Sequence, residues 1–264
     1  MKRLLLSSLS AVVGLVVIAS ATAATTVVVT PSDTQGWSTA DTRPGGAVNF
    51  VADATAPSGR GALQLTTDAT TTAKAQYMHT TSAPLASVTE ASYYTKQNSA
   101  SSFPLGDPSY QLPVFLLGGT AGFSTLVFEP YQNPAEGAVV TGTWQKWDVA
   151  SGLFWSTRTV ACENGTILGT PGGPAVYTLA AVEQACPNAV VSGFGVNVGS
   201  NNPGYDVETD LFDFNGTIYD FEPAIGPPTS KDQCRDGGWQ TFNNPTFKNQ
   251  GDCVSYVATG GRNP

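Results

Sequence analysis

The sequence is poor in charged residues, and its few basic residues are scattered. Lys, Arg, Asp and Glu make up 12% of the 264 residues, and the formal net charge is −8. Proteins that bind nucleic acids or anionic membrane surfaces need clustered Lys and Arg. The composition therefore argues against both kinds of partner, and we expect no nucleic-acid ligand.

The motifs of several enzyme and metal-site classes are also missing. There is no Gly-x-Ser-x-Gly motif, no Cys-x-x-Cys pair and only one histidine, His79. A Ser-His-Asp hydrolase would have to use His79, which lies in an alternating run typical of a strand. A zinc site would need His79 beside cysteines that are distant in the sequence. We interpret His79 as a structural residue of a strand.

Long apolar runs are absent after residue 18. The one such run, residues 4 to 18, follows Lys2 and Arg3 and precedes the small residues Ala21-Thr22-Ala23. This order is typical of a secretory signal peptide, so residues 1–23 are predicted to be removed. The run is shorter than the roughly 20 residues that a membrane helix needs. We therefore predict an exported protein, extracellular or periplasmic, with no membrane span.

The four cysteines form an even set, which in an exported chain indicates disulfides. They are Cys162, Cys186, Cys234 and Cys253, and three pairings are possible. We favour the local pairs Cys162–Cys186 and Cys234–Cys253. Each would close a loop of roughly 20 residues, which is worth about 3 kcal/mol in the chain-entropy model.

Short alternating or β-branched runs separated by Gly, Pro, Asn and Asp fill most of the chain. Many short strands at this spacing predict an all-β fold, a jelly-roll β-sandwich over residues 24–223. The sequence "PAIGPP" indicates a linker at 224–229, followed by a Cys-bearing tail at 230–264. The predicted strands are Thr25–Thr30, Ala47–Ala52, Ala62–Thr67, Ala73–His79, Ala91–Gln97, Gln111–Leu117, Phe123–Pro130, Thr143–Val149, Leu153–Val160 and Val190–Val198.

The clearest single signal is a β-hairpin around Asn215-Gly216. This dipeptide accepts the positive φ angles of a type I′ turn. Pairing Phe214 with Thr217 makes Phe212 face Tyr219 and Asp210 face Phe221. The aromatic face is then predicted to lie in the core, and the opposite face carries Leu211, Asp213, Ile218 and Asp220.

Helices are predicted in two places. Thr178 can cap a short helix that ends at Ala185, before Pro187. In the tail, Ser230 to Gln233 fits a capping box, and a second helix is expected from Gly251 to Ala258. The tail is too small to fold on its hydrophobic core alone, so we expect a disulfide-closed pair of helices, serving attachment or docking.

Several stretches occur together in an order that resembles a recurrent domain of uncharacterised exported bacterial proteins. They are "GRGALQLTTDATTTAKAQ", "LVFEPYQ", "GTWQKWD", "NGTIYDFEP" and the tail "SKDQCRDGGWQTF…FKNQGDCVSYV". The resemblance covers nearly the whole mature chain and implies a jelly-roll fold, export and no assigned activity. The family pattern has a more apolar residue at the position of Asp213. The pattern is also distantly like jelly-roll carbohydrate-binding modules.

The acidic stretch from Glu208 to Asp213 has two further interpretations. It resembles the Glu-x-Asp-x-x-Glu signature of laminarinase-type glycosidases, with Asp213 in the acid/base position. The hairpin register places Asp210 and Asp213 on opposite faces, so the carboxylates would converge only with a bulge. Alternatively, Asp206, Glu208, Asp210 and Asp213 supply oxygen ligands to Ca²⁺.

Four aromatic residues are candidates for stacking against sugar rings: Tyr131, Trp144, Trp147 and Trp155. Trp144 and Trp147 are three residues apart, so on a regular strand they point in opposite directions and one is expected in the core.

Three functions remain open at this stage. We favour a secreted, non-catalytic binding or surface-associated module that recognises glycans or a cell-envelope polymer. The alternatives are a glycoside hydrolase using Glu208 with Asp210 or Asp213, and a structural matrix or coat protein. The predicted sandwich does not discriminate among them, since one fold hosts many functions.

Overall fold

A computed structural model describes residues 24–224 and 226–262 of the chain. The predicted signal peptide lies outside these residues. Within them, no helix combines the length and the apolar character needed to cross a bilayer.

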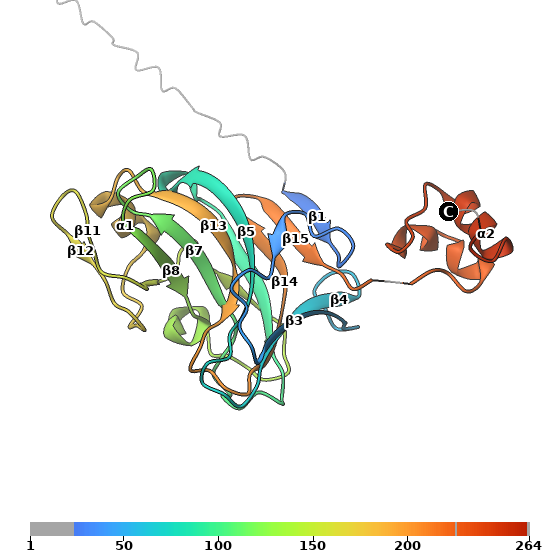
Figure 1. The fold of residues 1–264 in the computed structure, drawn as a ribbon, viewed down its shortest axis with the longest axis horizontal. Helices are drawn as coiled ribbons and strands as arrows, with labels where there is room; N and C mark the ends of the chain where they lie inside the picture. The colour runs from blue at the N-terminus through green and yellow to red at the C-terminus, as the bar shows by residue number, and fades with distance from the viewer. Residues whose placement is uncertain (1–23, 225, 263–264) are drawn as a thin grey trace, which may run out of the picture.

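Two sheets pack face to face and confirm the predicted β-sandwich of jelly-roll type (Figure 1). The first sheet contains β1 (Thr25–Val29), β3 (Gly46–Ala52), β4 (Gly61–Thr67), β6 (Ala91–Gln97), β9 (Gln145–Asp148), β14 (Asp206–Phe214) and β15 (Thr217–Phe221). The second has the order β10-β8-β7-β13-β5-β2. Its strands are β2 (Trp37–Ser38), β5 (Ala75–Pro84), β7 (Ser109–Phe115), β8 (Phe123–Phe128), β10 (Trp155–Ser156) and β13 (Val190–Val198).

Strand β14 organises the first sheet because it has three partners. It pairs with β6 over most of its length, with β4 over its first half and with β15 over its second half. Strand β1 then adds to β15 in parallel, with Thr25 opposite Thr217 and Val29 opposite Phe221. The remaining pairings within this sheet and the second sheet are antiparallel.

The predicted hairpin register is present, but β14 is not regular. Phe214 pairs with Thr217 and Phe212 with Tyr219. Val207 and Phe212 both lie in the core although five residues separate them, so one extra residue interrupts the alternation. Leu211, with φ at 45°, marks this bulge. The prediction that Asp210 shares the aromatic face is therefore wrong, because the bulge leaves Asp210 on the face of Glu208.

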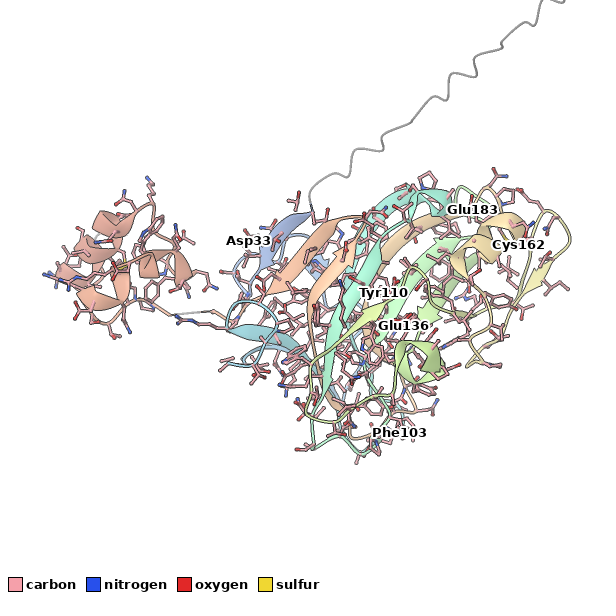
Figure 2. The ribbon with its side chains drawn as sticks, turned by 180° about the vertical axis from the view of Figure 1, so that it is seen from behind. Asp33, Phe103, Tyr110, Glu136, Cys162 and Glu183 are labelled. Atoms are coloured by element: carbon pink, nitrogen blue, oxygen red, sulfur yellow. A yellow bond between two sulfur atoms is a disulfide. The ribbon has the colours of Figure 1, made fainter. Side chains whose placement is uncertain are left out.

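The core is rich in aromatic rings that reach across from both sheets. Trp37, on the short strand β2, is 3% exposed and contacts the rings of Phe194, Phe212 and Phe221 at centroid distances of 5.1 to 5.6 Å. Tyr110, which lies within the sandwich in Figure 2, stacks on Phe212 at 4.2 Å. The sequence pattern did not predict β2, because two residues are too few to show periodicity.

The predicted strand Leu153–Val160 is shorter than expected. It is reduced to β10 and to β11 (Val160–Ala161), which pairs with β12 (Ile167–Leu168). Helix α1 (Leu179–Ala185) follows, and the Thr178 hydroxyl accepts a hydrogen bond from the Ala181 N–H at 3.1 Å, as predicted for an N-cap. A disulfide joins Cys162 to Cys186 and closes this excursion from the second sheet.

The tail forms its own small cluster beside the sandwich (Figure 1). The second disulfide, Cys234–Cys253, lies at its centre with Phe242 and Phe247. The predicted capping box is present, with the Gln233 side chain accepting from the Ser230 N–H. The expected second helix is present as α2 (Gln250–Ala258), whereas the first is a pair of 3₁₀ helices, η4 (Lys231–Cys234) and η5 (Gly238–Thr241). The sandwich contains three further 3₁₀ helices, η1 (Leu85–Ser87), η2 (Pro130–Gln132) and η3 (Pro134–Glu136).

Replacing both tail cysteines by serine (Cys234→Ser with Cys253→Ser) should unfold the tail without melting the sandwich. The tail core holds few apolar groups, and the cross-link contributes about 3 kcal/mol. Limited proteolysis with mass spectrometry should show new cuts after residue 229 only, and the melting temperature of the sandwich should stay constant. A tail that remains protected would contradict this expectation.

Candidate functional site

A row of paired residues crosses the solvent face of the second sheet. In register, it runs through Met78 on β5, Gly195 on β13, Gln111 on β7, Val127 on β8 and Trp155 on β10. Four strand spacings of about 4.8 Å give the row a length of about 19 Å. The outer face of the sheet thus presents a line of side chains running across the strands rather than along them.

Gly195, the second of these five positions, has no side chain. Its φ is 159°, and a Cβ atom built there would lie 2.2 Å from the Tyr77 carbonyl oxygen and 2.8 Å from the Met78 sulfur. A larger residue would have to displace backbone, so the sheet is bare at this position. The row therefore has a gap in its side chains between Met78 and Gln111.

Amide side chains line the neighbouring positions and are held in place by one another. The Asn197 Nδ2 donates to the Gln76 Oε1 at 3.0 Å. The Gln111 Nε2 donates to the Ser109 Oγ at 2.9 Å, and this hydroxyl donates to the Asn197 carbonyl oxygen at 3.0 Å. These contacts orient hydrogen-bonding groups on three adjacent strands.

Two adjoining hollows lie along the row and share Gln111; together we call them the groove. The aromatic end contains Tyr131, Trp155 and Tyr205. The opposite end contains Met78, Phe123 and an ion pair between Lys74 and Asp41. The groove thus combines ring faces with amides, hydroxyls and charged groups.

Glu129 fixes the orientation of Trp155 at the aromatic end. Its Oε2 accepts a hydrogen bond from the Trp155 Nε1 at 2.8 Å and another from Gln132. Burial raises the pKa of Glu129, and the hydrogen bonds from Trp155 and Gln132 partly oppose that rise. Trp155 itself stays half-buried, and Tyr131 is 44% exposed.

Asp107 is a second carboxyl group at the aromatic end. It is 8% exposed, and its Oδ2 accepts a hydrogen bond from the Thr95 hydroxyl at 2.8 Å. Burial raises the pKa of Asp107 to about 7, against the lowering effect of the Thr95 hydrogen bond. This carboxyl group is therefore poised between its neutral and charged forms near neutral pH.

The structure brings together only two of the four predicted aromatic residues. Tyr131 and Trp155 line the same hollow. Trp147 is fully buried and donates from its Nε1 to the Thr95 hydroxyl at 2.6 Å, so its assignment to a ligand site is wrong. Trp144 lies over the first sheet, where its Nε1 donates to Asp53 at 3.0 Å and its ring contacts the Lys96 ammonium.

The predicted calcium ligands are not gathered around one point. Asp206 accepts hydrogen bonds from Gln64 and Asn98. Glu208 forms an ion pair with Lys96 at 2.8 Å, and Asp213 accepts from the Gly216 N–H in the hairpin turn. Within residues 24–224 and 226–262, no group of three or more His, Cys, Asp or Glu side chains is arranged to hold a metal ion. The calcium site therefore stays a prediction to which these contacts lend no support.

The glycosidase interpretation requires two carboxyl groups that face a substrate, and Glu208 and Asp210 are instead bound by neighbouring residues. Glu208 is 7% exposed and neutralised by Lys96, and Asp210 is 0% exposed. Asp210 accepts a hydrogen bond from the Phe221 N–H at 3.0 Å, which ties β14 to β15. Glu208 and Asp210 are thus bound within the first sheet, and Asp213, the alternative partner, accepts from the hairpin turn.

Sequence reasoning missed most of the groove residues. Gln111 and Asn197 each sit at the outward positions of a predicted strand, but alternation alone does not say which outward positions become neighbours. Glu129 lies in the stretch "LVFEPYQ", and Asp107 and Tyr205 lie in loops. Only the sheet order brings these residues together.

The sequence matches no protein-family model and no curated protein. Among solved structures, the chain is similar to the xylan-binding CBM22-1 domain of Xyn10C from Paenibacillus barcinonensis, with 15% identity, 70% of this chain and 86% of that chain covered and a TM-score of 0.34. It is also similar to a family 11 carbohydrate-binding module from Clostridium thermocellum in complex with a β-1,3-1,4-mixed-linked tetrasaccharide. That match has 10% identity, coverage of 70% and 91%, and a TM-score of 0.40. At this distance the likeness assigns no ligand to the groove.

Replacing Asp210 by asparagine (Asp210→Asn) should make stability less dependent on pH. Burial, aided by the nearby Asp220 and Glu222, raises the pKa of Asp210 to about 8. The unfolded chain loses this proton near pH 4 and the folded chain near pH 8, so the stability that Asp210 contributes below pH 4 is lost as pH rises through that window. Denaturant unfolding between pH 5 and 9 should show a smaller decline for the variant. Parallel curves would contradict this.

Proposed function

We propose that the protein binds a glycan chain laid across the second sheet in the groove. The observation that carries the proposal is the row from Met78 to Trp155, with an indole ring at one end and the Gln111 and Asn197 amides in and beside it. The module is proposed to act outside the cytoplasm, a compartment that suits two disulfides.

A sugar chain has two kinds of surface, and the aromatic rings and amide side chains of the groove suit one kind each. Each pyranose ring has faces of C–H groups, which pack on an aromatic ring, and an edge of hydroxyl groups, which need hydrogen-bond partners. Trp155 and Tyr131 supply the rings, and Gln111 and Asn197 supply donors and acceptors already fixed by neighbours. Pre-ordered side chains lose little conformational entropy on binding.

The length and depth of the groove favour a chain over a single sugar. The row spans about 19 Å, estimated from the strand spacing. The two hollows adjoin at Gln111, so a ligand can continue from one hollow into the next. An extended ligand would contact both hollows at once, so we expect affinity to rise with the number of sugar units.

Removing the ring at the aromatic end (Trp155→Ala) should weaken glycan binding at least tenfold, equivalent to about 1.4 kcal/mol. The loss follows from the stacking surface and from the freed Glu129 carboxyl. A glycan array would first select oligosaccharides that bind the unaltered protein. Titration calorimetry on the best of these would then give the dissociation constants of both proteins.

The control is Trp144→Phe, which changes a tryptophan over the opposite sheet and keeps an aromatic ring against Lys96. This variant should bind as tightly as the unaltered protein, with circular dichroism showing that both variants fold. Equal affinity of the Trp155→Ala protein, or no glycan bound at all, would refute the proposed function.

A further inference from the structure

The aromatic end of the groove holds two carboxyl groups and no basic partner. Asp107 and Glu129 both line it, and the described residues around this hollow include no Lys, Arg or His. The remaining polar groups there are amides and hydroxyls, such as those of Asn197, Gln111 and Ser109. Two carboxyl groups thus share a partly enclosed space without a counter-charge.

Asp107 has an unused hydrogen-bonding atom at this site. The Thr95 hydroxyl occupies its Oδ2, whereas its buried Oδ1 has no hydrogen-bond partner. A buried polar atom without a partner costs free energy until a partner arrives. The residue is more than nine-tenths buried and lines the hollow, so the unpartnered oxygen belongs to a side chain at the wall of the proposed site.

Aromatic rings surround the same space. Phe103 lies at one end of the sandwich in Figure 2, and its ring is 6.1 Å from that of Tyr131 and 6.3 Å from that of Tyr205. Trp155 is held against Glu129 by its indole N–H. The faces of such rings attract cations, most strongly where water is excluded. The charge and the rings therefore favour the same kind of ligand group.

We propose that the aromatic end of the groove binds the ammonium group of an amino sugar, that is, a sugar whose nitrogen is not acetylated. This inference rests on the proposed glycan-binding function and adds the class of ligand. An ammonium group has three donors and no acceptor, which matches two carboxyl groups and nothing basic. A carboxylated or sulfated sugar at this end would meet repulsion from Asp107 and Glu129.

The test uses an array of matched pairs, in which each oligosaccharide is present as the free amine and as its N-acetylated form on several backbones. We expect the amine form to bind at least tenfold more tightly in the best pair. The advantage should survive 0.15 M salt, where the Debye length is about 8 Å, because the contact is direct and partly buried.

Two variants separate the site from the general acidity of the protein. Asp107→Asn and Glu129→Gln should each bring the ratio of amine to acetyl affinity close to one, whatever the absolute affinity. Asp148→Asn is the matched control, since it removes the same charge from an exposed position on β9 of the other sheet and should leave the ratio unchanged.

The outcomes are distinguishable. Tight binding of glycans with no preference for the amine form would overturn the ammonium site and leave the glycan groove intact. A preference that all three variants keep would mean non-specific attraction to an acidic protein and would also overturn it. No binding of any glycan would overturn the groove as well.

Discussion

The packing of aromatic rings between the two sheets determines which residues remain outside. Phe212 on β14 stacks on Tyr110 of β7 and lies 5.7 Å from Phe194 of β13. Because side chains alternate along a strand, Tyr110 inside places Gln111 outside, and Phe194 inside places Gly195 outside. The groove is thus a consequence of the core. The outward residues of the row are neighbours because the core residues next to them on each strand are neighbours.

The sequence predicted those elements whose signals are local. The Asn215-Gly216 turn specified the hairpin register, and Thr178 specified the start of α1. It did not predict the bulge at Leu211, because β14 changes partner there from β4 to β15, a matter of tertiary structure. Nor did it predict the groove, whose residues come from five strands and several loops. Residue type identified Tyr131 and Trp155 as candidates, and only the sheet order showed that they meet.

The acidic strand shows how composition can mislead. Four acids within eight residues look like a metal site, yet each has a different role in the structure. Asp206 is bound by amides, Glu208 by an ammonium group and Asp213 by a turn N–H. Asp210 holds β14 to β15 at the bulge, where backbone pairing is interrupted. Alternation and the bulge leave Asp206, Glu208 and Asp210 on one face of β14, and different neighbours bind each carboxyl group.

The parallel pairing of β1 with β15 has a mechanical consequence. Thr25 lies opposite Thr217 and Val29 opposite Phe221, so the two strands run side by side in the same direction over five residue pairs. The tail follows the end of β15. Tension applied between the start of β1 and the tail would pull the two strands in opposite directions along their length. All the hydrogen bonds between β1 and β15 would then bear the load together, in shear. Strands loaded in this way separate as a unit rather than one bond at a time, so the sandwich should resist tension applied through its tail.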